Sequence, residues 1–216
     1  METSLTTLQA TLQAERRLLW AAPAYGAIFI GMYVLPSAWV AMFGFHLALV
    51  LALRPRLRTL PTRWLAPVSP PLLLAMIVVG FVGGTGLWLI WPYVGVAAYY
   101  RAHLIALGLS DGFAWAFFIV YFSLVNPWLE EAFWRDELTH PTRGLALVDM
   151  LYAGFHLLML APFVGPFWLL VVFVILTATG WLWRNVARLS GSLFPCVVCH
   201  ILADLSIVWV LYQKWL

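Results

Sequence analysis

The chain is organised around residues 111–135, DGFAWAFFIVYFSLVNPWLEEAFWR, an apolar run that ends in two adjacent glutamates and an arginine. An ionisable side chain in or at the rim of a membrane segment costs several kcal/mol unless it is paired or solvated. Glu130, Glu131 and Arg135 therefore indicate a specific role for the end of this run. The surrounding sequence tells which kind of protein carries it.

The composition places the chain among polytopic membrane proteins. Of its 216 residues, 64% are hydrophobic and 10% are charged, and the mean hydropathy is +0.93. Soluble domains carry about 25% charged residues, which excludes an ordinary soluble fold. The basic balance comes from arginines in short loops and indicates membrane orientation rather than nucleic-acid binding. We expect one membrane domain in contact with the lipid bilayer and no nucleic-acid partner.

Seven apolar stretches predict an all-α membrane bundle of about seven transmembrane helices, since each is close to the roughly 20 residues that cross a bilayer. Polar or basic loops are expected between them at 54–63, 99–103 and 136–143. Residues 1–17 are expected to form a tail or a short interfacial helix, residues 18–110 the first three spans, and residues 111–216 a catalytic core. The seven stretches are 18–35, 38–53, 71–91, 111–130, 144–161, 166–183 and 192–212.

The basic residues predict the orientation, because cytoplasmic loops of membrane proteins carry an excess of arginine and lysine. With the N-terminus in the cytoplasm, only Arg101 and Lys214 of the twelve basic residues fall outside. We expect a multi-pass protein of the cytoplasmic (inner) membrane with its C-terminus outside. The remaining basic residues, all inside, are Arg16, Arg17, Arg54, Arg56, Arg58, Arg63, Arg135, Arg143, Arg184 and Arg188.

The helical period separates the two glutamates. Glu131 and Arg135 are four residues apart and can pair on one face of a helix. Glu130 is turned about 100° away, with Asn126 one turn before it on the same face. One acid is thus neutralised while the other can face a cavity. The alternative is that these charges only mark the helix end at the cytoplasmic surface.

Two later spans carry polar stripes. In one, Asp149, Tyr152 and His156 follow one another at helical spacing. In the last, His200 and Asp204 are four residues apart, and the aspartate can orient the histidine, accept its N–H, or be protonated itself. The alternatives are a hydrogen-bonded core histidine in the first case and a pair joining two helices in the second.

Glu130, His156 and His200 can converge from three helices on the inner half of the membrane. A carboxylate, two imidazoles and the acid of Asp204 around water can perform general-base hydrolysis. The same side chains could equally bind a divalent metal, with Glu130, His156 and His200 as its ligands.

Residues 196–200, CVVCH, match the attachment pattern of c-type haem. The motif lies within an apolar span, where a macrocycle has no room, so we expect no haem and a colourless protein. Cys196 and Cys199 are expected to be small packing residues.

Three elements, each in its own span, together resemble the CAAX protease and bacteriocin-processing (CPBP, or Abi) family of intramembrane endopeptidases, which includes the Ras-converting prenyl-protein protease. They are EExxxR at 130–135, YxxxH at 152–156 and HxxxD at 200–204. The resemblance covers about residues 112–212, and the first three spans show no family signature.

The resemblance implies that Glu130 activates the attacking water and that His156 shares this role. It implies that His200 and Asp204 stabilise the oxyanion, while Glu131 and Arg135 hold the first motif in shape. No obligatory metal or other cofactor is implied, although the family has also been described as metalloproteases.

Two residues depart from the family pattern. Tyr152 stands where phenylalanine is usual, beside His156. Asp204 stands where many members have asparagine, and an ionised aspartate cannot donate a hydrogen bond to an oxyanion. Asp204 is therefore either protonated or sets the tautomer of His200, which then donates alone.

The resemblance favours an endopeptidase that cuts a peptide or protein near the membrane surface, for example in a C-terminal or leader segment of an exported protein. The short chain with compact loops is typical of bacterial relatives. The alternative is a non-catalytic transporter, scaffold or immunity protein, because buried histidine and acid stripes also suit proton relays.

Overall fold

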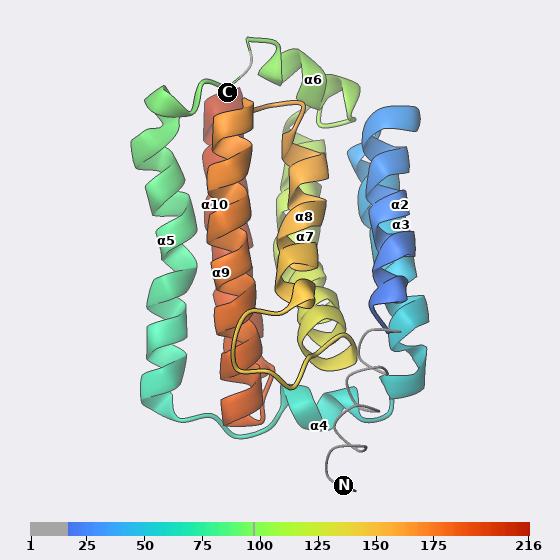
Figure 1. The fold of residues 1–216 in the computed structure, drawn as a ribbon. Coiled ribbons are helices and arrows are strands. Elements are labelled where there is room, and N and C mark those ends of the chain that lie inside the picture. The colour runs from blue at the N-terminus through green and yellow to red at the C-terminus, as the bar shows by residue number, and fades with distance from the viewer. Residues whose placement is uncertain (1–16, 97) are drawn as a thin grey trace, which may run out of the picture.

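The computed structural model describes residues 17–96 and 98–216, and this part of the chain is helical with irregular connections and no strand. The long helices run side by side, and two short helices lie at opposite ends of the bundle (Figure 1). The predicted all-α architecture is confirmed for these residues. The tail or interfacial helix expected at residues 1–17 falls, apart from Arg17, outside the described part.

Two helices are extended by a π-helical segment, α2 by Ile30–Val34 and α7 by Phe133–Glu137. Single 3-10 turns occupy Leu18–Trp20 and Arg54–Arg56. The α-helices are α2 (Ala21–Phe29), α3 (Ala38–Leu53), α4 (Leu60–Trp64), α5 (Pro70–Val94), α6 (Tyr100–Ala106), α7 (Gly112–Ala132), α8 (Leu147–Leu160), α9 (Pro166–Ser190) and α10 (Phe194–Trp215).

The bundle has two layers. In one layer α3 contacts α7, α7 contacts α10, and α10 packs along α5. In the other layer α2 contacts α8, and α8 packs along α9. In Figure 1, α2, α8 and α9 stand in front of α3, α7 and α10, and α5 stands at the side of the bundle. The candidate site residues come from both layers, with α7 and α10 behind and α8 in front.

Five helical stretches are long and apolar enough to cross a membrane, and two apolar helices, Leu18–Val34 and Leu147–Leu160, are shorter. With 14 residues at about 1.5 Å each, α8 is roughly 21 Å long, less than the ~30 Å hydrocarbon core. The chain is a multi-pass membrane protein, while the count of seven spans and the orientation stay predictions. The five stretches are Ala38–Arg56, Pro70–Val94, Gly112–Glu137, Pro166–Ser190 and Phe194–Trp215.

The expected loops are more ordered than the sequence suggested. The segment 54–63 contains most of α4, and the segment 99–103 contains the start of α6, whose Tyr100 hydroxyl donates to the Leu211 carbonyl at 2.6 Å. The loop predicted to begin at residue 136 begins later. Asp136 and Glu137 belong to the π-helical extension of α7, and their side chains are buried.

Arginines from the α3–α4 connection and from α4 explain how Asp136 and Glu137 can be buried. Arg56 Nε lies 2.7 Å from a Glu137 oxygen, and Arg63 Nε lies 3.7 Å from an Asp136 oxygen. Opposite charges offset part of the cost of removing each group from water. The ion pairs tie the end of α7 to the α3–α4 connection.

Local features of single residues determine where α7 begins and where α9 ends. Asp111 caps α7, since its Oδ1 accepts from the N–H groups of Phe113 and Ala114 at 2.9 and 3.0 Å. The predicted start of this span near Asp111 is thereby confirmed. α9 ends at Gly191, whose φ of 70° lies in the left-handed region that favours glycine.

The GxxxG spacing of Gly80 and Gly84 brings α5 against α10. A Cβ atom on Gly80 would lie 2.7 Å from the Cys199 carbonyl oxygen, and one on Gly84 would overlap Ser206. The absence of side chains lets the two backbones approach, as the spacing indicated. This contact holds α10, which carries His200 and Asp204.

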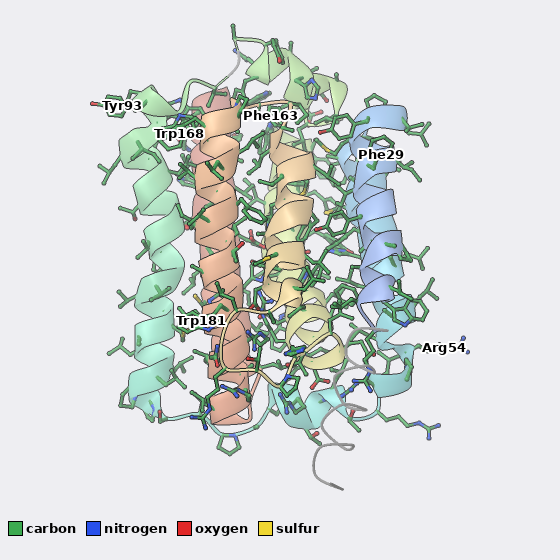
Figure 2. The ribbon with its side chains drawn as sticks, viewed as in Figure 1. Phe29, Arg54, Tyr93, Phe163, Trp168 and Trp181 are labelled. Carbon is green, nitrogen blue, oxygen red and sulfur yellow. The ribbon has the colours of Figure 1, made fainter. Side chains whose placement is uncertain are left out.

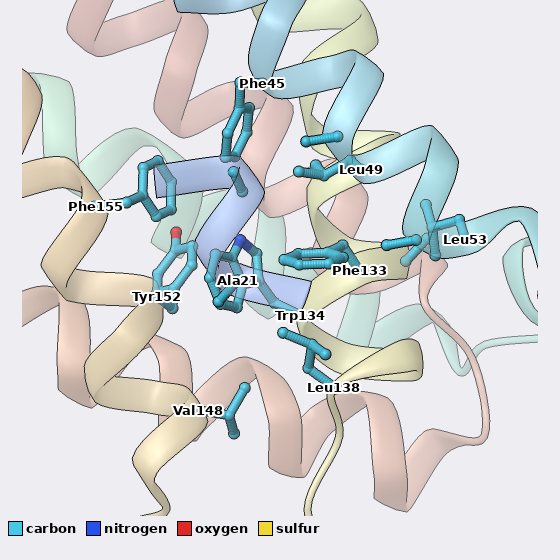
Figure 3. Packing of buried hydrophobic residues seen from close by; sticks show 14 of the residues in the cluster. Ala21, Phe45, Leu49, Leu53, Phe133, Trp134, Leu138, Val148, Tyr152 and Phe155 are labelled. Carbon is cyan, nitrogen blue, oxygen red and sulfur yellow. The ribbon is translucent and has the colours of Figure 1, made fainter. Parts of the chain in front are cut away.

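An aromatic core joins α2, α3, the end of α7 and α8 (Figure 3). Trp134 stacks on Phe155 with ring centroids 5.6 Å apart, and Phe45 meets the same ring at 5.1 Å. Burying one aromatic side chain removes roughly 150–250 Å² from contact with solvent or lipid. The core fixes the end of α7 beside α8.

Apolar side chains cover the outside of the bundle (Figure 2). Phe29 is 50% exposed and Tyr93 is 75% exposed, and both point away from the protein. Arg54 projects at the end where α4 lies. An apolar exterior with arginine at the rim fits a protein surrounded by lipid.

Candidate active site

Glu131 and Arg135 form the predicted pair at the end of α7. Arg135 Nε lies 3.4 Å from Glu131 Oε2, and both side chains are fully buried. The guanidinium also lies over the Tyr152 ring, 4.2 Å from its centroid, and 5.8 Å from the ring centroid of Trp183. A carboxylate and two aromatic faces thus hold the arginine, as the i,i+4 spacing indicated for the carboxylate.

Glu130 is buried beside this pair, with 2% of its surface exposed. Its Oε2 has no hydrogen-bond partner among the described residues. An unpaired buried acceptor is costly, and such groups in a folded protein often have a chemical role. The carboxylate is therefore available to accept a hydrogen bond from a water molecule or a ligand.

His200 connects α10 to the first motif. Its Nδ1 lies 2.8 Å from Glu131 Oε1, and its Nε2 lies 3.5 Å from Asp204 Oδ1. The predicted pairing of His200 with Asp204 is present, although the contact is long. The contact with Glu131 was not predicted, and it gives that acid two cationic or donor partners, Arg135 and His200.

His156 is held by its own helix. Its Nδ1 lies 2.9 Å from the Tyr152 carbonyl oxygen, which can only accept, so Nδ1 carries the proton and a neutral ring leaves Nε2 as an acceptor. Among the described residues, no hydrogen bond or ion pair joins His156 to Glu130, His200 or Asp204.

Tyr152 is the shared neighbour of the two histidines. Its ring centroid is 5.0 Å from that of His156 and 6.5 Å from that of His200. Arg135 covers the same ring. The structure therefore gathers the three predicted motifs around Tyr152, where the two helix layers meet.

Residues 112–206 match a known protein family, described as type II CAAX prenyl endopeptidase, Rce1-like. We call the matched segment, residues 112–206, the Rce1-like domain. For this segment the match supports the resemblance to the CAAX protease family. A comparison with curated proteins and another with solved structures found no match.

The Rce1-like domain begins with α7 and ends within α10, so it includes the whole predicted set from Asn126 to Asp204. It leaves out α2, α3 and α5. The fold nevertheless packs these helices against the domain: α3 on α7, α2 on α8, and α5 on α10.

One residue outside the Rce1-like domain reaches its site. His46 of α3 lies with Nε2 3.0 Å from Asn126 Oδ1 and with Nδ1 3.1 Å from the Tyr121 hydroxyl. Asn126 in turn donates from Nδ2 to Asp204 Oδ2 at 3.2 Å. Sequence reasoning missed His46, because its helix shows no family motif. The available signal was an ionisable side chain alone in an apolar span.

Asp149 lies on the same face of α8 as Tyr152, as the stripe predicted, but it pairs with Arg184 of α9 and not with His156. Its two oxygens accept from Arg184 Nε and Nη2 at 2.9 and 2.7 Å, and Oδ2 also accepts from the Ala146 N–H at 2.9 Å. Two helical turns separate Asp149 from His156, about 10 Å along the axis. At that distance the aspartate meets α9 and not the centre of the site.

Arg184 organises the connection between α7 and α8. Besides Asp149, its guanidinium donates to the carbonyl oxygens of His140 at 3.2 Å and Gly144 at 2.6 Å, and it also contacts that of Thr142. The side chain is fully buried. Arg184 thus makes several of the hydrogen bonds that hold the loop between the first and second motifs, and Trp181, Asn185 and Arg188 of α9 donate to further carbonyl oxygens of the same loop.

The cysteines are buried in α10, and Cys196 Sγ donates to the Trp183 carbonyl oxygen at 3.3 Å. This is the packing role expected of them, and the absence of haem stays a prediction. Among the described residues, no group of three or more His, Cys, Asp or Glu side chains is placed to hold a metal ion. The set Glu130, His156 and His200 is thus not assembled as metal ligands here.

Proposed function

We propose that the chain is an intramembrane endopeptidase that hydrolyses a peptide bond near the membrane surface with a water activated by Glu130. Two observations support this. The Rce1-like domain matches a family of endopeptidases. Glu130 Oε2 is buried near the His200–Glu131 contact and has no hydrogen-bond partner in the described part of the chain. The second observation carries the mechanism, because a general base needs a free acceptor for the proton of the water.

In the proposed reaction, Glu130 takes a proton from water while the water oxygen bonds to the carbonyl carbon of the substrate. The tetrahedral intermediate then collapses, the C–N bond breaks, and the proton passes to the leaving amine. General base and acid catalysis of this kind contributes about 10²–10⁴-fold in rate. His156 shares the task, since its Nε2 can accept from the same water when Nδ1–H is held by the Tyr152 carbonyl.

His200 is the proposed donor to the oxyanion. Its Nδ1 is firmly held by Glu131 at 2.8 Å, whereas its Nε2 has only the 3.5 Å contact with Asp204. Because both ring nitrogens face carboxylates, which only accept, His200 in this proposal carries a proton on each nitrogen, and the loosely held Nε2–H is the one that can donate to the developing negative charge. Asp204 then orients the ring and makes no contact of its own with the oxyanion, because an ionised carboxylate has no proton to donate.

The proposed substrate is a peptide or protein with a segment in or beside the membrane, such as a C-terminal or leader segment. The family description names prenylated CAAX chains, so a farnesylated CAAX peptide is a reasonable first probe. An unmodified peptide of the same sequence is its control. Preferential cutting of the farnesylated peptide supports a lipid-modified substrate, and equal cutting supports recognition of the peptide alone.

Membranes from cells with the wild-type chain and from cells with Glu130→Ala test the activity. Mass spectrometry compares the peptide termini in the two samples. We expect a cut next to an apolar segment that is present with the wild type and missing with Glu130→Ala and Glu130→Gln. Asp111→Asn is the control, since it makes the same acid-to-amide change at the other end of α7, where asparagine can also cap the helix, and it should keep the cut.

Full activity in Glu130→Gln contradicts the proposed mechanism, because the amide of glutamine cannot act as the general base. If the peptide termini do not differ between wild type and Glu130→Ala, and both proteins are equally abundant, the result favours a transporter or scaffold over a protease. Both outcomes can be recognised before the substrate is identified.

A further inference from the structure

We propose that His46 is a positioning residue for this site: acting through Asn126, it holds the Asp204 carboxylate in the place from which that acid orients His200. The inference rests on the proposed function and adds a residue to it that lies outside the Rce1-like domain. It is carried by an unbroken series of buried polar contacts that runs from α3 through α7 to α10.

The direction of each hydrogen bond in this series follows from its neighbour. The Asp204 carboxylate can only accept, so the amide of Asn126 must turn its Nδ2 toward it, at 3.2 Å. The amide oxygen then faces His46 at 3.0 Å and needs a donor, which places the proton of a neutral His46 on Nε2. The remaining Nδ1 accepts from the Tyr121 hydroxyl at 3.1 Å.

The series depends on the orientation of the Asn126 amide. Both His46 and Asn126 are almost fully buried, with 5% and 1% of their surfaces exposed. If the Nε2–H of His46 is removed, the Asn126 oxygen loses its donor in the protein interior, and the amide is no longer held with Nδ2 toward Asp204. The Asp204 carboxylate then loses the donor that fixes it beside His200 Nε2.

The position of His46 in the sequence supports a specific role. It is the one ionisable residue in α3, a helix that is otherwise made of apolar side chains and Gly44. α3 also packs on α7, so His46 has a second possible task, which is only to join these two helices. The test must therefore separate positioning of Asp204 from general stability.

His46→Gln and His46→Asn form a matched pair for this purpose. The amide nitrogen of glutamine reaches the place of the imidazole Nε2 and can donate to Asn126, whereas the shorter asparagine reaches only the place of Nδ1. Both variants carry the same amide group. If His46 positions Asp204 through Asn126, the glutamine variant retains the function and the asparagine variant loses it.

The first readout does not depend on proteolysis. In the full-length chain, labelled with ¹⁵N-histidine in detergent micelles, His46 should show a protonated Nε2 and an unprotonated Nδ1. His46→Asn should shift the ring ¹⁵N signals of His200, and His46→Gln should leave them near their wild-type positions. Tyr121→Phe, which removes only the donor to Nδ1, should shift them in the direction of His46→Asn by a smaller amount.

The second readout is cleavage of a peptide that spans the Glu130-dependent cut. We expect His46→Asn to lower kcat at least tenfold with little change in KM, while His46→Gln stays within about threefold of the wild type. The thermal unfolding midpoints of the two variants should be similar. If the wild type shows no Glu130-dependent cut, the proposed function has failed, and the ¹⁵N signals of His200 still decide the inference.

Unchanged His200 signals in both His46→Asn and Tyr121→Phe overturn the proposal. So does an equal loss of activity in His46→Asn and His46→Gln that follows their loss of thermal stability. Either result reduces His46 to a contact between α3 and α7.

Discussion

Glu131 Oε1 lies 2.8 Å from His200 Nδ1, a contact between two residues 69 positions apart in the chain. The other oxygen of the same carboxylate faces Arg135 at 3.4 Å. Glu131 is therefore the point at which the first and third motifs of the Rce1-like domain meet. Oε2 of the neighbouring Glu130 has no hydrogen-bond partner among the residues that the structure describes, which is the division of roles that the proposed mechanism needs.

Removing Glu131 should destabilise the fold strongly. Glu131→Ala leaves Arg135 buried without a carboxylate, and breaking a buried pair in this way costs about 3–5 kcal/mol. We expect a clear loss in the thermal unfolding midpoint of the purified protein in detergent. The double variant Glu131→Ala/Arg135→Met should recover part of the loss, because no buried charge is left unpaired. A double variant less stable than Glu131→Ala contradicts this account.

The loop between α7 and α8 should depend on Arg184. Arg184→Met removes the donors to Asp149 and to the loop carbonyls, and we expect a loss of about 3 kcal/mol or more because a buried carboxylate is left unpaired. Limited proteolysis should then cut the loop at 138–146 faster than in the wild type. Arg54→Met is the control and should leave the cutting rate nearly unchanged, because Arg54 is exposed and makes no hydrogen bond to this loop among the described residues.

The approach of α5 to α10 should tolerate no side chain at Gly84. Gly84→Leu meets Ser206 of α10 and should cost about 1–3 kcal/mol from overpacking, or separate the helices. Gly86→Leu is the matched control, because a Cβ atom there meets nothing within 4 Å. Thermal unfolding of both variants tests the prediction, and an equal loss of stability would show that the α5–α10 contact does not depend on Gly84.

Among the histidines, His156 should matter for activity and His140 should not. His156→Ala removes an acceptor beside the proposed water and should lower kcat by about 10²-fold or more, in the range of general base catalysis. His140 lies in the loop, where alanine keeps the carbonyl contact with Arg184 and loses only the hydrogen bond that its Nδ1 accepts from the Thr142 N–H at 3.2 Å. The rate of the Glu130-dependent cut, measured at matched amounts of folded protein, tests both.

Metal removal separates the two chemistries that the sequence left open. The proposed mechanism needs no metal, so dialysis against EDTA should leave the rate of the Glu130-dependent cut unchanged. A rate that falls with EDTA and returns with zinc would instead favour a metalloprotease. Dialysis without chelator is the control for loss of protein during the procedure.

Relationships within one helix were predictable from the sequence. The pairs Glu131–Arg135 and His200–Asp204 are each four residues apart, and the geometry of an α-helix brings such residues together whatever surrounds them. The start of α7 at Asp111 is equally local, because a capping side chain acts on the first backbone N–H groups of its own helix. The family motifs added the roles of Glu130 and His156 as expectations.

The sequence by itself determined that the chain forms apolar helices in a membrane, because the lengths of its apolar runs and its few charges allow no other class. Only the tertiary structure decided which polar groups meet: His46 with Asn126 across 80 positions, and Asp149 with Arg184 across 35. Contacts between helices depend on how each helix is rotated and how closely it packs. The side chains of neighbouring helices set this rotation and this packing distance, and the residue spacing within a single helix does not predict them.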